Sequence, residues 1–204
     1  MGFFSRNSDT DACAFLDQQH NEVDELFSKF EDSDAGEGGR RIFEQIRDKL
    51  RVHAQIEEEI FYPPIKDAKA AETGEEIAEA VEEHYQIKLI ISDIDTTRPR
   101  GDVFKGKLKV LKEDVQHHVG EERDTVFPDA RKYLGEERLE ELGDQLRARF
   151  QQLTKSGTRA TANSKTPAKE RKTATPMRRT AVPSKSAAKA KGSRKMTSSA
   201  KARR

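Results

Sequence analysis

Two segments of the sequence repeat one pattern: residues 53–63 read HAQIEEEIFYP, and residues 118–128 read HVGEERDTVFP. In each, a glutamate follows the first histidine by four residues, and the closing proline follows it by ten. Side chains four residues apart lie on the same face of an α-helix. Each segment therefore predicts a helix that presents an imidazole and a carboxylate together. The pairs are His53 with Glu57 and His118 with Glu122.

Two further histidines, His20 and His84, extend the pattern to the rest of the chain. The intervals between successive members of this set of four are 33, 31 and 34 residues. In an up-down-up-down bundle, positions at one height on successive helices are separated by half a helix, a loop and half a helix. Near-equal intervals therefore predict four helices with their histidines in one layer, the arrangement from which bundles build metal and cofactor sites.

Apolar residues recur at helical spacing in five stretches, and residues 11–153 show no sustained alternation typical of strands. The sequence therefore predicts an all-α fold: an up-down-up-down four-helix bundle with a short fifth helix packed outside it. The second helix is expected to break or kink at Pro63-Pro64, because proline disrupts the helical hydrogen-bond ladder. The expected helices span about 11–30, 40–62, 73–96, 101–127 and 136–153.

The chain has 204 residues and a formal net charge of +1, but its charges are unevenly distributed. Residues 155–204 contain 16 Lys and Arg and one acidic residue, Glu170, so this segment carries +15 and the rest of the chain −14. The length allows one ordinary domain. We therefore expect a flexible N-terminus over residues 1–10, one bundle domain over 11–153, and a basic tail over 154–204.

The tail lacks Leu, Ile, Phe, Tyr and Trp, so it cannot bury enough apolar surface to offset the entropy of ordering it. We expect it to be disordered. Its Lys, Arg, Ala, Ser, Thr and Pro composition resembles the basic tails of histone-like, DNA-compacting proteins. Such a segment neutralises phosphates without reading bases, which predicts sequence-independent DNA or RNA binding through residues 155–204. The acidic body is the competing partner for the same charges.

Cys13 is the one cysteine in the chain, which excludes an intrachain disulfide framework and is typical of a reducing cytoplasm. No apolar run approaches the roughly 18 residues that span a bilayer. The N-terminal sequence MGFFSRNSD also lacks the apolar core of a signal peptide. These features predict a cytoplasmic protein with no membrane partner, and the basic tail extends the prediction to association with the nucleoid.

Glutamates on the inner face of a bundle need partners, because burial of an unpaired carboxylate costs several kcal/mol or forces its protonation. A cation would satisfy them, since imidazole and carboxylate together are ligands for iron, zinc or manganese. A metal-free polar core is the alternative. The six candidate ligands are His20, His53, Glu57, His84, His118 and Glu122.

This arrangement resembles the hemerythrin-like (HHE) cation-binding domain. The resemblance covers about residues 11–153 and rests on the doubled H-x-x-x-E with its closing F-(Y)-P, together with His20 and His84. It implies a non-haem centre of two iron ions inside a four-helix bundle. By this resemblance His20 and His53 would bind one iron, His84 and His118 the other, and Glu57 and Glu122 would bridge them.

The sequence departs from the oxygen-carrying hemerythrins at two positions. Those proteins have a second histidine on the third helix, where this chain has Lys88, and they place an aspartate five residues after the last histidine, where this chain has Glu122 at four. The resemblance is therefore to the bacterial HHE branch. Six side chains, two of them bridging, supply about eight of the roughly twelve bonds of two octahedral irons. About four positions are left for water, hydroxide, or a diatomic or peroxide ligand.

Several neighbouring residues compete for roles at this site. His117 also has a glutamate four residues on, Glu121, but the apolar stripe and the distance to the closing proline favour the histidine that follows it. Glu58 lies next to the site in the sequence. It is either an auxiliary ligand or a residue on a solvated face of the helix. Tyr62 and Tyr85 are candidates either for hydrogen bonding to the ligands or for core packing, and core packing is favoured for each.

Three functions follow from these observations. The first is a di-iron protein that binds or senses oxygen, nitric oxide or peroxide in oxidative or nitrosative stress, or buffers iron, tethered to nucleic acid by its tail. The second is a di-iron oxidase or peroxidase. The third is a structural protein that coats nucleic acid and uses the bundle as a scaffold. The sequence shows no polar constellation for an organic substrate beyond the ligand set, so it favours binding or sensing over catalysis.

Overall fold

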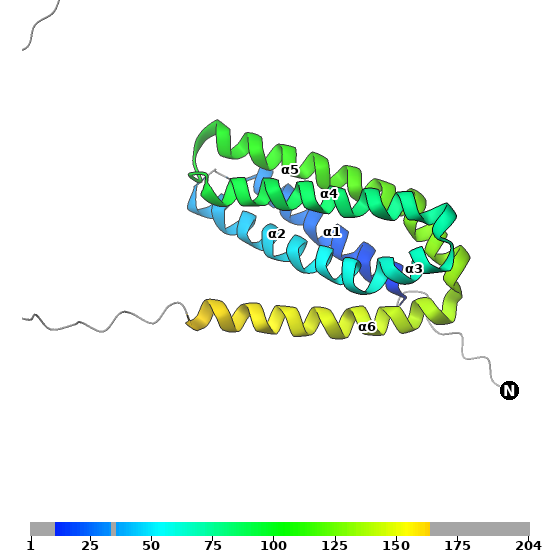
Figure 1. Ribbon diagram of the computed structural model, residues 1–204. Coiled ribbons are helices and arrows are strands. Elements are labelled where there is room, and N and C mark those ends of the chain that lie inside the picture. Colours follow the sequence, from blue (N-terminus) through cyan, green and yellow to red (C-terminus); the bar gives the residue numbers. More distant parts are fainter. Residues whose placement is uncertain (1–10, 34–35, 164–204) are drawn as a thin grey trace, which may run out of the picture. The chain divides into compact units, whose positions relative to one another are not determined.

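The computed structural model describes residues 11–33 and 36–163, and every element within them is helical. The predicted all-α four-helix bundle is confirmed (Figure 1). Its four long helices are α1 (Ala12–Glu31), α2 (Glu37–Ile56), α4 (Ala70–Thr96) and α5 (Gly101–Glu121). The first ten residues and the tail from residue 164 onward lie outside the described residues, as do the expectations made for them.

Helix boundaries follow local chemistry. The Asp11 carboxylate accepts a 2.7 Å hydrogen bond from the Ala14 backbone N–H, which satisfies one of the free donors at the start of α1. Gly101 begins α5 with a φ of 75°, in the left-handed region that favours glycine. These signals fix where the helices start and therefore the height at which each histidine enters the bundle.

Both repeated segments contain a π-helical turn that begins at the glutamate. These turns are η2 (Glu57–Phe61) and η3 (Glu122–Val126), and they lead directly into α3 (Tyr62–Ala68) and α6 (Phe127–Asn163). In each, a backbone N–H reaches back five residues to the carbonyl of the glutamate. Such turns occur frequently at functional sites.

Of the expected break or kink at Pro63-Pro64, the break is wrong, because the chain stays helical to Ala68. The prolines occupy the first turn of α3, immediately after the π-helical turn. A backbone N–H there has no obligatory partner within the helix, so proline is tolerated. Pro128 occupies the corresponding place at the start of α6.

The fifth helix is the part of α6 that follows a kink at Gly135, where φ is 75°. Beyond the kink, α6 packs against α1 and α2, as expected for a helix outside the four-helix bundle (Figure 1). Three of its leucines are fully buried there: Leu139, Leu142 and Leu146. The helix runs to Asn163 rather than ending at Leu153, so the first residues of the segment predicted to be disordered are helical.

The apolar core forms two clusters separated by a polar layer. One cluster joins the start of α1 to α3, η3 and α6, and includes Leu16 and Ile56. The other fills the opposite end of the four helices and includes Val23 and Leu50. The four histidines lie between the clusters, one on each helix. Within the described part of the chain, no helix is both long and apolar enough to cross a membrane.

Candidate metal centre

Four buried histidines from four helices point their Nε2 atoms at one another in two pairs. The Nε2 atoms of His20 on α1 and His53 on α2 are 2.8 Å apart. Those of His84 on α4 and His118 on α5 are 3.0 Å apart. The bundle therefore brings together the four histidines selected from the sequence, in the pairs that the resemblance implied.

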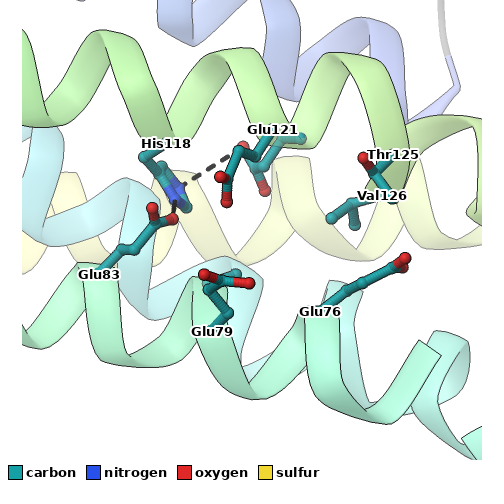
Figure 2. Close-up of a pocket in the computed structure, with 9 residues that line it drawn as sticks. Glu76, Glu79, Glu83, His118, Glu121, Thr125 and Val126 are labelled. Atoms are coloured by element: carbon teal, nitrogen blue, oxygen red, sulfur yellow. Dashed lines mark hydrogen bonds and ion pairs between the residues drawn. The ribbon is translucent and has the colours of Figure 1, made fainter.

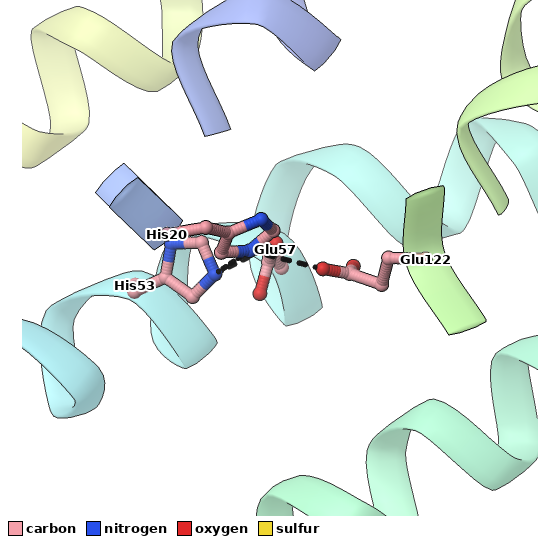
Figure 3. Close-up of side chains that lie close together, drawn as sticks. All are labelled: His20, His53, Glu57 and Glu122. Atoms are coloured by element: carbon pink, nitrogen blue, oxygen red, sulfur yellow. Dashed lines mark hydrogen bonds and ion pairs between the residues drawn. The ribbon is translucent and has the colours of Figure 1, made fainter. Parts of the chain in front are cut away.

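Glu57 lies between the two pairs and offers one oxygen to each. Figure 3 shows it beside His20, His53 and Glu122. Its Oε1 is 3.1 Å from Nε2 of His53, and its Oε2 is 3.3 Å from Nε2 of His84. The side chain is fully buried, and neither oxygen has a hydrogen-bond partner among the described residues. A carboxylate in this position is arranged to bridge two cations.

Glu122 also contacts both pairs, but through a single oxygen. Its Oε2 is 3.1 Å from Nε2 of His20 and 3.6 Å from Nε2 of His118. Its other oxygen, Oε1, accepts a 2.8 Å hydrogen bond from the Tyr62 hydroxyl. The two glutamates are therefore equivalent in position but differ in the number of oxygens left for a ligand.

The spacing of these atoms fits bound cations. Ligand atoms held about 2.1 Å from one ion, at right angles, lie about 3 Å apart. The separations described above run from 2.8 to 3.6 Å. Two groups of ligand atoms converge in this way and share Glu57: His20, His53, Glu57 and Glu122 form one, and Glu57, His84 and His118 the other. Each group can hold a metal ion.

Three of the four histidines have an acceptor on the outer ring nitrogen, Nδ1. The Nδ1 of His53 is 3.3 Å from Gln19 Oε1, and the Nδ1 of His118 is 2.8 Å from Glu83 Oε2. The Nδ1 of His84 is 3.0 Å from an oxygen of Glu58. An acceptor there holds the ring proton on Nδ1 and leaves Nε2 with a lone pair for a metal. The Nδ1 of His20 has no hydrogen-bond partner among the described residues, and Oδ1 of Asp17 lies 4.0 Å from it.

The centre has two halves, one with His20 and His53 and the other with His84 and His118. The repeat relates the two halves, but the side chains that support their histidines differ in charge. His53 and His118 are 65 residues apart, and the same offset relates Glu58 to Arg123 and Tyr62 to Phe127. Two anionic carboxylates, Glu58 and Glu83, support the histidines of one half. In the other half the support is the neutral amide of Gln19, and Arg123 turns outward to pair with Asp17 at 2.6 Å.

Burial and charge shift the inner pKa values in different directions. Burial, reinforced by the charge of Glu57, raises the pKa of Glu122 to about 7. Burial opposes ionisation of Glu57, but the charge of His53 beside it holds its pKa well below the ordinary value. Burial and the charge of His53 lower the pKa of His20. For His53 burial is outweighed by Glu57, so its pKa is raised. A bound cation would relieve these competing charges.

The other residues that the sequence suggested for roles at the site lie outside the ligand set. His117 is exposed and pairs with Glu121 at 3.2 Å, outside the inner layer. Lys88 points to Glu58, 2.6 Å away, so it neutralises the carboxylate that supports His84 and does not enter the ligand set. Glu58 is likewise a support rather than a member of either ligand group.

The two tyrosines have different roles. Tyr62 packs in the core, as favoured, and also fills the alternative role, because its hydroxyl donates a hydrogen bond to Glu122. Tyr85 is 53% exposed and does not pack in the core. Gln19 and Glu83 were not predicted at all. Their position in the sequence could have indicated them, since Gln19 immediately precedes His20 and Glu83 immediately precedes His84.

A small apolar cavity of about 20 Å³ adjoins the histidine layer. All four histidines line it, together with side chains of the neighbouring core cluster. The apolar residues around it are Val23, Leu50, Ala54, Ile87, Val115 and Val119. Lys88 does not line it. The cavity holds about one water-sized molecule.

Comparisons with known proteins agree with this geometry. The Hemerythrin HHE cation binding domain matches residues 11–130. A crystal structure of a hemerythrin HHE cation binding domain-containing protein from Mycobacterium kansasii superimposes with a TM-score of 0.66 and 23% identity, over 74% of this chain and 92% of that one. At this identity the likeness shows the shared fold.

Two curated relatives match the same region. A DNA nickase of Nostoc sp. (strain PCC 7120 / SAG 25.82 / UTEX 2576) is 28% identical over 129 residues, which are 63% of this chain but only 36% of the nickase. The chain thus spans about a third of that relative. The uncharacterised protein Rv2633c of Mycobacterium tuberculosis is 27% identical over 113 residues, which are 55% of this chain and 67% of that protein. With the family match covering more than half of its length, the chain belongs to the hemerythrin HHE cation-binding domain family.

Proposed function

We propose that the protein holds two iron ions in the candidate centre and binds or senses a small ligand there: oxygen, nitric oxide or peroxide. The proposal starts from the two converging groups of imidazole and carboxylate atoms, a donor set suited to iron. Iron bound there would offer coordination positions and electrons to such a ligand. The protein supplies the fixed ligands, the supporting acceptors on the histidines and the exclusion of bulk water.

The observation that carries the choice of ligand is the cavity beside the histidines. Its volume of about 20 Å³, enough for about one water-sized molecule, restricts the ligand to the smallest candidates and excludes an organic substrate. Its surface is almost entirely apolar, with valine, leucine and isoleucine side chains beside the histidines. An apolar cavity favours a neutral diatomic molecule over a charged or strongly hydrated one.

A peroxide-consuming di-iron enzyme is the second candidate. Peroxide also has two heavy atoms, so the same cavity admits it. The two functions are separated by turnover: a sensor or carrier binds its ligand stoichiometrically, whereas a peroxidase consumes many equivalents. DNA nicking is the activity in the name of the Nostoc relative, and this chain covers only about a third of that protein.

The basic tail adds a second element to the proposal. Residues 155–204 carry +15, and we propose that they hold the di-iron module on DNA or RNA by phosphate contacts that do not depend on sequence. A cytoplasmic, nucleoid-associated protein would then meet oxygen, nitric oxide or peroxide close to nucleic acid.

Adding one methylene group to a side chain that lines the cavity tests whether the ligand binds there. Val115→Ile fills space beside the histidines, whereas Val52→Ile adds the same group on α2 against the other core cluster. After iron loading, nitric oxide and oxygen should change the optical spectrum of the wild type and of the Val52 variant. Val115→Ile should keep its iron but bind either gas at least tenfold more weakly. Equal binding by both variants would refute the cavity as the ligand site.

A further inference from the structure

A cleft lined by glutamates reaches the candidate centre from outside (Figure 2). It lies between α4 and the α5–η3 segment and has a volume of about 160 Å³. Its lining runs from exposed to buried residues, since Glu79 is exposed and Glu122, a bridging candidate, is buried. Among the described residues that line the cleft, none is Lys or Arg. The lining carboxylates are Glu76, Glu79, Glu83, Glu121 and Glu122.

Two of the lining carboxylates, Glu83 and Glu121, form an outer cluster of ligand atoms with the neighbouring His117. Glu83, His117 and Glu121 each offer one atom, and these atoms lie within 4.8 Å of one another. The Nε2 of His117 is 3.2 Å from Glu121 Oε1 and 3.5 Å from Glu83 Oε1. The His117 side chain is 67% exposed, so solvent cations reach this cluster directly.

Glu83 joins the outer cluster to the centre. While its Oε1 faces His117, its Oε2 is 2.8 Å from Nδ1 of His118. Glu122, which also lines the cleft, gives a second observation that points to a cation. Its Oε2 is fully buried, has no hydrogen-bond partner among the described residues and lies 3.1 Å and 3.6 Å from the Nε2 atoms of His20 and His118. A desolvated carboxylate oxygen that contacts only imidazole nitrogens attracts a positive ion strongly.

We propose that Glu83, His117 and Glu121 form an outer cation site and that divalent first-row metal ions enter the centre from it through this cleft. The inference rests on the proposed function, because it concerns how the two metal positions are filled. Imidazole and carboxylate suit such ions, and the mixed exposure of the three ligands suits transient binding. The ion passes to His118 and Glu122, which line the same cleft.

A second cleft that reaches the layer is less acidic. It lies between α1 and α5, has a volume of about 280 Å³ and is lined by His20, Asp24 and Arg123. Its lining thus carries one carboxylate and one guanidinium, and the guanidinium pairs with Asp17 at 2.6 Å. The cleft lined by five glutamates therefore attracts a cation more strongly.

The test follows loading of the full-length, metal-free protein with Co²⁺ alone, by the rise of its visible absorption in stopped flow. H117A/E121Q removes two outer ligands but no candidate ligand of the centre. Glu113→Gln is the charge-matched control, because Glu113 is a 60% exposed carboxylate on the same helix, away from the cleft. Circular dichroism checks that each variant is folded, and equilibrium dialysis counts the bound ions.

We expect the wild type and Glu113→Gln to load at the same rate and to bind a weak third Co²⁺ beyond the two tight ones. H117A/E121Q should load about tenfold more slowly, lose the weak third ion and still reach two tight ions. Wild-type loading should slow with added salt, as attraction by the acidic cleft requires.

An unchanged loading rate in H117A/E121Q, with the same number of bound ions, would overturn the outer site and leave the centre untouched. Failure of the wild type to bind any Co²⁺ tightly would instead overturn the proposed metal centre, and this inference with it. The two failures are thus distinguished by the wild type alone.

Discussion

The hydroxyl of Tyr62 donates a 2.8 Å hydrogen bond to Oε1 of Glu122. The other glutamate has no such bond, because the repeat places Phe127 where Tyr62 stands in the first copy. The two rings otherwise occupy corresponding positions, with Tyr62 stacked near His84 and Phe127 stacked near His20. A single oxygen atom therefore makes the two bridging candidates unequal.

Tyr62→Phe should make the two halves alike in this respect. Loss of a hydrogen bond to a carboxylate should lower the free energy of unfolding of the metal-free protein by about 1.5–3 kcal/mol. The fold should persist, because phenylalanine already fills the corresponding position in the second copy. Urea unfolding followed by circular dichroism measures this change, and Tyr85→Phe, at an exposed position, should leave stability unchanged. Equal stability of both variants with the wild type would show that the Tyr62 bond contributes nothing.

The charge difference between the halves predicts two unequal metal sites. Glu83 supports His118 with a carboxylate, whereas Gln19 supports His53 with an amide. A carboxylate on the outer nitrogen makes the imidazole a stronger ligand, and loss of such a support typically weakens metal binding 10- to 100-fold. Glu83→Gln should therefore weaken one of the two ions by at least tenfold and leave the other unchanged.

Competition with a coloured chelator measures both affinities. Glu82→Gln is the control for Glu83→Gln, since it removes the same charge from an exposed position one residue earlier. The prediction is wrong if both ions weaken together, or if the control weakens them as much.

The shifted pKa values predict opposite pH dependences for metal binding and for metal-free stability. The pKa of Glu122 is about 7 in the fold but about 4.3 in an unfolded chain. Between these values Glu122 binds more protons in the folded state, so its contribution to the stability of the metal-free protein falls as pH rises. The lowered pKa of His20 makes the opposite contribution below about 6.5. Above about 6.5 the raised pKa of His53 acts together with that of Glu122, so the stability of the metal-free protein should fall as pH rises from about 6.5 to 8. A metal must displace the proton of Glu122, so its affinity should rise over the same range.

Thermal unfolding of chelator-treated protein and metal titrations at pH 6 and pH 8 check these signs. Stronger metal binding at pH 6 than at pH 8 would contradict the assignment of Glu122 as a ligand that must lose its proton.

The basic tail predicts salt-sensitive binding to nucleic acid. Full-length protein should bind duplex DNA of unrelated sequences alike, with a log–log salt slope near −0.9 per phosphate contacted. A chain ending at Asn163 keeps all of α6 and loses 14 of the 16 basic residues of the tail, so it should not bind. Fluorescence anisotropy titrations at several salt concentrations measure both. Equal binding by the two chains, or none by either at low salt, would show that the tail is not a nucleic-acid arm.

The sequence predicts the layer of six side chains because two independent periods agree on it. The 3.6-residue period puts His53 and Glu57 on one helix face, and near-equal intervals put four histidines at one height. Both statements concern positions along regular helices, which local physics controls. The structure accordingly brings these residues together.

What the sequence misses depends on contacts between helices. Glu83 follows Glu82 and precedes His84, so it reads as one more charge on a solvated face until the fold turns it toward His118. Tyr62 has the spacing of a core residue, and its hydroxyl partner lies on a different helix, 60 residues away. The π-helical turn after Ile56 is also unmarked, because its residues satisfy the ordinary helical pattern and only the following prolines hint at altered hydrogen bonding.

The most direct measurement is the iron content of the full-length protein after anaerobic reconstitution with ferrous iron and removal of loose metal. We predict close to two irons per chain, with ferric charge-transfer absorption in the near ultraviolet after oxidation. His53→Ala and His118→Ala should each lose about one iron, because each removes a ligand from a different pair. His117→Ala should keep both, since His117 lies outside the inner layer. Iron content near zero in the wild type, or an equal loss in His117→Ala and His118→Ala, would contradict the assignment of the centre.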